Sequence, residues 1–179
     1  MKMIVFGAPD HEEKLARQLC KAAGVYTATA IKDGKPCHPG NAYQTSEFEF
    51  DQVVPTGTLL EVVAFECSIP AEHSCDHHRP SDFGYSMGPN AFWEASSLGQ
   101  LAKLLGYPTP SDVDTLLNLK PGTAALTAAN DHSPAQAYQG HCPGITREQF
   151  SDFRNNLLSS QSGLSADEVS GEVAGWAYV

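Results

Sequence analysis

Short apolar runs alternate with amphipathic segments along the first half of the chain. Met1–Phe6 is an apolar run of strand length, and a helix is predicted over His11–Ala23 because apolar residues recur there at helical spacing before Gly24. Val25–Ile31 alternates as a strand does, and Leu59–Phe65 is continuously apolar, which is typical of a strand covered on both faces. The pattern predicts an α/β fold with a partly parallel sheet flanked by helices.

The second half of the chain is predicted to be helical. Helical spacing and end signals mark five segments: Ala91–Leu105, Ser111 or Asp112 to Leu119, Lys120–Asn130, Pro134 to Gly140, and residues 145–161. Asp131 then falls at a break between two helices. Two segments rich in Pro and Gly are expected to be a hairpin or long loop (33–41) and a loop (79–90). Ser165–Glu168 resembles a capping box near the chain end.

Composition narrows the class of protein. The 179 residues can form one domain, which we divide into an α/β metal-binding domain (1–140) and a helical C-terminal extension packed on it (141–179). A formal charge of −10 argues against binding long nucleic acid but is compatible with a small anionic substrate held by a metal. We expect a cytoplasmic protein without a membrane span. The five cysteines include no CxxC pair, and we expect most of them to be reduced.

Acidic and histidine residues gather at the ends of the predicted elements. Asp10 and His11 follow the first strand, Glu66 follows Leu59–Phe65, and Asp131 follows a helix in the second half. The tripeptide 76–78, Asp-His-His, combines a carboxylate with two imidazoles, which are ligands for hard and borderline metal ions. Because strand ends on one edge of a parallel sheet converge, four separated segments could form one site.

The order of these motifs resembles the DHH phosphoesterases over residues 1–140. The resemblance rests on GAPDHEE after the first strand, VVAFECSIP, CDHH, an Ala-Ser-Ser helix start and a later aspartate among small residues. That superfamily includes manganese-dependent pyrophosphatases, single-strand exonucleases, oligoribonucleases and cyclic dinucleotide phosphodiesterases. This chain departs from it in the first motif, where the family has a histidine and two aspartates, and in having Glu66 for an aspartate. It is also too short for the family's second, substrate-binding domain, so we expect a minimal DHH-like domain.

The resemblance implies roles for individual residues. The metal ligands would be Asp10, His11, Glu66, Asp76, His77 and Asp131, with Asp76 and His78 catalytic and with His78 and Arg79 binding substrate phosphate. In the first motif it is open which of the family's positions correspond to Ala8, Asp10, His11, Glu12 and Glu13. Manganese is the favoured cofactor, with magnesium and zinc as alternatives. The implied function is hydrolysis of a nucleotide or another small phosphorylated compound by metal-activated water.

Other interpretations of the same residues stay open. A degenerate DHH-like domain could bind a nucleotide or a protein partner without turnover, and a homodimer could cover the exposed cleft. A Cys/His zinc site could involve Cys75, His141 and Cys142. Asp10, His11 and Asp131 could cap helices, Glu66 could be a solvated rim carboxylate, Arg79 could pair with Asp82, and residues 41–43 could cover the cleft. Phe92, Trp93 and Tyr138 could stack on a base, although their spacing favours the core.

Overall fold

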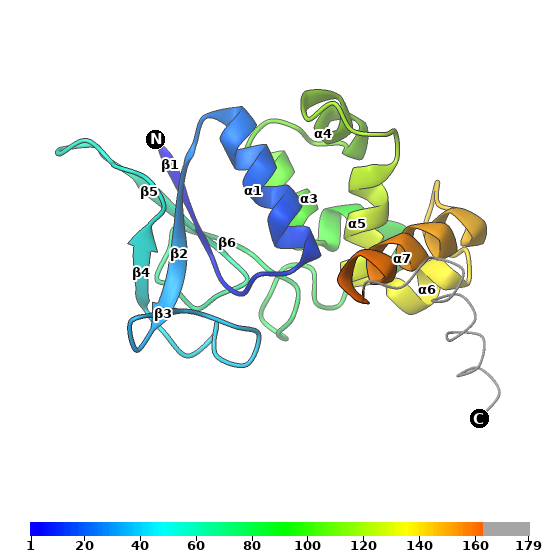
Figure 1. The fold of residues 1–179 in the computed structure, drawn as a ribbon, viewed down its shortest axis with the longest axis horizontal. Coiled ribbons are helices and arrows are strands. Elements are labelled where there is room, and N and C mark those ends of the chain that lie inside the picture. The colour runs from blue at the N-terminus through cyan, green and yellow to red at the C-terminus, as the bar shows by residue number, and fades with distance from the viewer. Residues whose placement is uncertain (163–179) are drawn as a thin grey trace.

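The computed structural model describes residues 1–162, and these contain one mixed sheet with helices beside it (Figure 1). The sheet has six strands in the order β3-β2-β1-β5-β6, and β4 also pairs with β2. The strands are β1 (Lys2–Phe6), β2 (Tyr26–Lys32), β3 (Lys35–Pro36), β4 (Glu47–Phe50), β5 (Glu61–Phe65) and β6 (His73–Cys75).

The centre of the sheet is parallel. β1 pairs in parallel with both β2 and β5, and β5 pairs in parallel with β6, whereas β3 and β4 run antiparallel to β2. In this register Phe6 lies beside Phe65, and Phe65 lies beside Cys75. The carboxyl ends of three strands therefore meet at one edge, from which the motifs of the predicted site continue.

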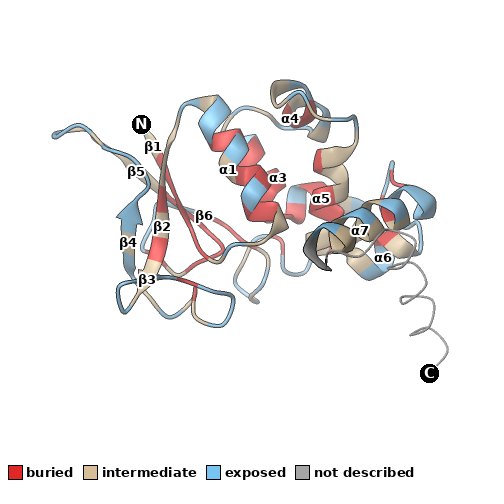
Figure 2. Ribbon diagram, viewed as in Figure 1, coloured by how far each residue is buried: buried red, intermediate tan, exposed pale blue. Residues whose placement is uncertain are grey.

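Helices dominate the chain after the sheet. They are α1 (His11–Ala23), the 3-10 turn η1 (Pro89–Ala91), α2 (Phe92–Ala95), α3 (Ser97–Leu104), α4 (Pro110–Leu116), α5 (Thr123–His132), α6 (Pro134–Tyr138) and α7 (Arg147–Ser162). The prediction of an α/β fold with a partly parallel sheet and a helical second half is confirmed. Figure 2 shows that the buried residues concentrate in the sheet and in the helix faces turned toward it.

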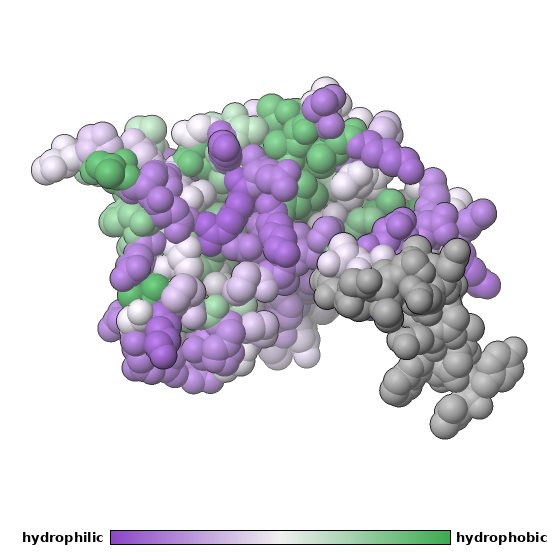
Figure 3. Space-filling view, viewed as in Figure 1, coloured by the Kyte–Doolittle hydropathy of each residue, from purple (hydrophilic) through white to green (hydrophobic). Residues whose placement is uncertain are grey.

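Two apolar clusters hold the layers together. The larger one joins the sheet residues Ile4, Phe6, Val63 and Phe65 to residues of α1, α3 and α5. The smaller one, with Met3, Val5, Ala28 and Ala64, covers the other face of the sheet and includes loop residues such as Ala42. In Figure 3 hydrophilic side chains cover the outward side of α1, as expected for an amphipathic helix that packs on one face only.

Several boundaries differ from the predictions. The expected helix Ala91–Leu105 is broken at Ser96, whose extended backbone and side chain cap α3 by accepting a hydrogen bond from the Gly99 amide. Thr109, rather than Ser111 or Asp112, caps α4. Asp131 lies inside the last turn of α5 instead of at a break. The short strands β4 and β6 were not predicted.

The remaining structural expectations have mixed outcomes. No helix among residues 1–162 is long and apolar enough to cross a membrane. All five cysteines are buried free thiols. The expected capping box at 165–168 lies outside the described residues. The division at residues 140 and 141 stays a prediction.

Candidate metal centre

The edge of the sheet is shaped so that the first motif can pass close to Glu66. Gly7 follows β1 and donates a backbone hydrogen bond to the Phe65 carbonyl at 3.0 Å. A Cβ atom at Gly7 would lie 2.1 Å from the Glu66 carbonyl oxygen, so only glycine fits there. Glu66 itself has a φ of 52°, a left-handed conformation that is unusual for a residue with a side chain.

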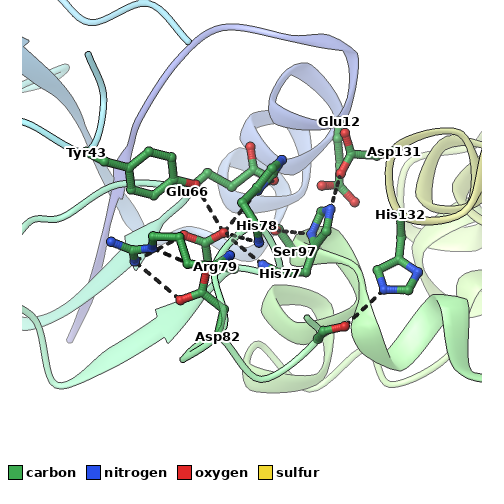
Figure 4. Close-up of polar contacts among 12 residues, drawn as sticks. Glu12, Tyr43, Glu66, His77, His78, Arg79, Asp82, Ser97, Asp131 and His132 are labelled. Atoms are coloured by element: carbon green, nitrogen blue, oxygen red, sulfur yellow. Dashed lines mark hydrogen bonds and ion pairs between the residues drawn. The ribbon is translucent and has the colours of Figure 1, made fainter. Parts of the chain in front are cut away.

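Four side chains from four segments converge behind this edge (Figure 4). Glu12 comes from the first turn of α1, Glu66 from the end of β5, His77 from the loop after β6 and Asp131 from the end of α5. One potential ligand atom of each lies within 4.8 Å of those of the other three. The residues therefore form a cluster that could hold a metal ion, as the sequence predicted for Glu66, His77 and Asp131.

Each carboxylate of this cluster has an oxygen without a hydrogen bond. Oε2 of Glu12, Oε1 of Glu66 and Oδ2 of Asp131 are buried and make no hydrogen bond to any described residue. Oδ2 of Asp131 instead faces Nε2 of His77 at 3.1 Å. Buried polar atoms are nearly always hydrogen-bonded in proteins. Buried carboxylate oxygens with so few hydrogen-bond partners, gathered in one cluster, thus indicate a site built for something that the polypeptide does not supply.

Burial and mutual repulsion disturb the ionisation of the cluster. Burial, together with the charges of Asp131 and Glu66, raises the pKa of Glu12 well above its ordinary value. Burial and the charges of Asp131 and Asp10 raise the pKa of Glu66 to about 8. Burial opposes ionisation of Asp131 too, but His77 and His78 outweigh it and lower the Asp131 pKa. Without a cation, Glu66, with a pKa of about 8, retains its proton at neutral pH.

The His77 ring is fixed by neighbours outside the cluster. Its Nδ1 lies 3.1 Å from Oγ of Ser97, the first residue of α3, which leaves Nε2 directed toward Asp131. The His132 ring lies 5.1 Å from the His77 ring, and its Nε2 lies 3.1 Å from the Gly84 carbonyl oxygen. Such partners orient an imidazole ligand and select its tautomer.

Asp76 organises the tripeptide instead of joining the four-residue cluster. Its Oδ1 accepts hydrogen bonds from the His77 and His78 amides, at 2.8 and 3.1 Å, and from the Tyr43 hydroxyl at 3.1 Å. It also lies 3.0 Å from Nδ1 of His78. Burial opposes ionisation of Asp76, but the bonds from His78 and Tyr43 prevail and lower the pKa of Asp76. The ligand role assigned to it stays a prediction.

His78 brings positive charge to the cluster. Its hydrogen bond with Asp76 raises the pKa of His78 to about 9, against the opposing effect of burial. Nδ1 of His78 also lies 3.9 Å from Oε1 of Glu66. Glu66, His77 and His78 form a second, overlapping group of potential ligands. A cationic, exposed imidazole beside these carboxylates can bind an anionic substrate group.

Arg79 is hydrogen-bonded and ion-paired with neighbouring side chains. Its backbone amide donates to Oδ2 of Asp82 at 2.7 Å, and its guanidinium contacts Asp82, Oγ of Ser68 and Oδ2 of Asp76. The pairing with Asp82, an alternative in the sequence analysis, is thus present (Figure 4). Binding of substrate phosphate by Arg79 stays a prediction.

Asp10 and His11 of the first motif make different contacts. Asp10 caps α1 by accepting a hydrogen bond from the Glu13 amide at 2.6 Å, and burial raises its pKa to about 6. Asp10 also lines a small cavity with Glu66 and His78. The His11 ring packs edge-on against Phe153, 5.6 Å between ring centres, and His11 belongs to neither group of potential ligands.

Glu12 is the member of the cluster that the sequence analysis did not select. It stands in the acidic run whose register was open, and only the position of the helix start turns it inward. It is 2% exposed, and its Oε1 accepts a hydrogen bond from the Leu98 amide of α3 at 3.1 Å. Ser97 was likewise noted only as part of a helix start. The available signal was helical phase, which places Glu12 on the same helix face as Leu15 and Leu19.

Two alternatives from the sequence find no support in the described residues. Cys75 and Cys142 are part of the larger apolar cluster, and neither potential ligand group includes a cysteine. Phe92 and Trp93 are buried, and Nε1 of Trp93 donates to the Pro108 carbonyl, so both belong to the core. A cavity of about 510 Å³ between α4 and α5 lies away from the cluster, since none of its lining residues belongs to it.

Comparisons of the chain with protein-family profiles, curated proteins and solved structures found no match. The resemblance to DHH phosphoesterases therefore stays a prediction that rests on the sequence motifs. The geometry adds an independent point. Segments far apart in the chain meet at one edge of a parallel sheet with unpartnered carboxylates, where ligand sites of α/β proteins are found.

Proposed function

We propose that the protein is a metal-dependent phosphohydrolase or phosphodiesterase that acts on a nucleotide or another small phosphorylated compound. The observation that supports this is the buried cluster of Glu12, Glu66, His77 and Asp131, in which Glu12 and Glu66 each have an oxygen without a hydrogen bond. We assign Glu12, Glu66, His77 and Asp131 as the ligands of a divalent cation. A cation at this point would replace the retained protons and satisfy every unpartnered oxygen of the cluster.

Manganese is the metal that the donor set favours. Three carboxylates and one imidazole form a mainly oxygen-based set, which suits manganese better than the sulfur-rich or histidine-rich sites that zinc prefers. Donors on opposite sides of an ion at about 2.2 Å lie about 4.4 Å apart. The spacing of up to 4.8 Å is therefore close to what one ion requires.

The residues around the cluster would hold the substrate. A bound divalent ion lowers the pKa of water and offsets charge on a phosphoryl group. His78, held by Asp76, would place its positive charge next to a phosphoryl oxygen. Asp76 keeps this imidazole charged and oriented, and Ser97 keeps Nε2 of His77 directed into the cluster. Substrate binding and ligand orientation are thus divided between neighbouring side chains.

The proposal is tested with the full chain, first stripped of metal with a chelator and then titrated with manganese. Calorimetry gives the affinity, and a panel of phosphate monoesters, diesters and pyrophosphate gives the activity. Glu12→Gln and Asp131→Asn keep side-chain size and remove charge. We expect each to weaken manganese binding by more than about 100-fold, since removing a partner one shell away already costs about 10–100-fold. Glu49→Gln, on exposed β4, is the matched control.

The outcomes separate the proposal from its alternative. Loss of manganese binding and of hydrolysis in both variants, with the control unchanged, would support the proposal. If the wild-type protein binds manganese but returns every phosphate compound unchanged, the domain binds without turnover. If Glu12→Gln and Asp131→Asn bind manganese as tightly as wild type, the assigned ligands are wrong.

A further inference from the structure

The segment between β3 and β4, residues 37–46, forms an ordered wall beside the cluster. At its start the Cys37 amide donates to the Ala30 carbonyl at 2.9 Å, and near its end Oγ1 of Thr45 donates to the Ile31 carbonyl at 2.6 Å. Both acceptors belong to β2. In the middle, the Ala42 carbonyl accepts from the Ser68 amide at 3.4 Å. The segment is thus attached to the sheet at both ends and to the chain after β5 at its centre.

Tyr43 joins this wall to the DHH tripeptide. Its hydroxyl donates to Oδ1 of Asp76 at 3.1 Å, and the Arg79 guanidinium carbon lies 4.4 Å from the centre of its ring. The His78 ring is 6.4 Å away. Figure 4 shows Tyr43 on the side of Glu66 and His78 opposite Glu12 and Asp131. The ring therefore bounds the site on the side away from Glu12 and Asp131.

A small cavity lies between the wall and the cluster. Its volume is about 120 Å³, and its lining comes from the loop before α1 (Ala8, Asp10), from the wall (Pro39, Ala42, Tyr43) and from the sheet edge (Glu66, His78). Pockets for drug-sized ligands have about 300–1,000 Å³. This cavity can therefore take one compact group, with the rest of a substrate outside it.

We infer that the 37–46 wall makes the site selective for phosphate monoesters over phosphate diesters. This inference rests on the proposed function. A monoester has one organic substituent, which can leave the cavity through its opening, whereas the second substituent of a diester would meet the wall. Hydrolysis forms a P–O bond from water and breaks the P–O bond to the alcohol, which leaves with a proton from that water. The products are the free alcohol and inorganic phosphate.

The first test compares kcat/KM of the manganese-loaded protein for p-nitrophenyl phosphate and bis-p-nitrophenyl phosphate. We expect wild type to prefer the monoester, and Tyr43→Ala to reduce this preference at least about tenfold, the lower limit for one steric contact in a pocket. Tyr43→Phe keeps the ring and should keep the preference. Pro39→Ala, at an exposed position of the wall, should reduce it in the same direction if Tyr43→Ala does not fold.

The second test measures binding and does not require turnover. Calorimetry of the manganese-loaded protein with methyl phosphate and dimethyl phosphate should show tighter binding of the monoester, and the wall variants should narrow this difference. Equal affinities, equal kcat/KM values, or a preference that neither Tyr43→Ala nor Pro39→Ala changes would overturn the inference. Absence of hydrolysis with selective binding would instead contradict the proposed function and leave the selectivity of the wall supported.

Discussion

The raised pKa of Glu66 predicts that the metal-free protein loses stability as the pH rises. Below about pH 4.5 Glu66 is protonated in both the folded and the unfolded chain. Above that pH the unfolded chain releases the proton, but the folded chain keeps it until about pH 8. The folded state is therefore stabilised less and less across this range. The loss belongs to the metal-free protein, because a bound cation would replace the proton.

The magnitude follows from the same values. One pKa unit corresponds to about 1.4 kcal/mol, so between pH 5 and pH 8 Glu66 alone accounts for a loss on the order of 4 kcal/mol. Glu12 and Asp131 share the same charge repulsion, so removing Glu66 also lowers the pKa of Glu12. We therefore expect Glu66→Gln to remove this loss of about 4 kcal/mol, and the contribution of Glu12 to the pH dependence to become smaller as well.

The assay is urea unfolding of chelator-treated protein at several values between pH 5 and pH 8. Wild type and Glu66→Gln are compared with Glu49→Gln, which removes the same charge from exposed β4 and controls for the overall charge of −10. Excess manganese should restore wild type at pH 8 by about 2.7 kcal/mol at 100 times its Kd. A wild-type profile that is flat or rises with pH would refute the reasoning, as would a Glu66→Gln profile as steep as that of wild type.

Two further substitutions test the support around the cluster. Ser97→Ala should weaken manganese binding about 10–100-fold in calorimetry, because the His77 ring loses the partner that fixes its tautomer; unchanged affinity would show that Ser97 does not position His77. Gly84→Ala should lower the free energy of unfolding by about 1–3 kcal/mol, since its Cβ would lie 2.0 Å from the Ala95 carbonyl oxygen. Gly88→Ala, which meets nothing within 4 Å, is the control, and equal effects of the two would contradict this account.

The elements with a clear hydrophobic period were predictable from the sequence. The unit β1-α1-β2 follows the expected pattern, including the left-handed Gly24 that ends α1. The strand β6 has three residues of which only Cys75 is buried, so no period could reveal it. At the break at Ser96, α3 approaches α2 so closely that a side chain at position 99 would collide with the Trp93 carbonyl. Such contacts are invisible until the chain is folded.

In the candidate site, too, some features could be predicted from the sequence and others depend on the folded structure. The positions of Glu66 and His77 followed from the rule that parallel strand ends converge, and Asp131 followed from the resemblance to the family; the structure brings the three residues together. The rule says nothing about which carboxylate oxygens remain free. Asp76 directs Oδ1 at four donor atoms of its own loop and of Tyr43, whereas Glu12 keeps an oxygen unpartnered. That distinction depends on side-chain geometry, which spacing does not encode.

The free energy stored around Glu66 is difficult to explain by folding alone. A left-handed backbone costs roughly 1–2 kcal/mol for a residue with a side chain, and a buried polar group without a partner costs about 1–3 kcal/mol. Glu66 has both features, and Glu12 adds a further unpartnered oxygen. The sum is a large part of the 5–15 kcal/mol that stabilises a typical domain. A glycine at position 66 would avoid both costs, so a carboxylate there is best explained by a cation that needs it.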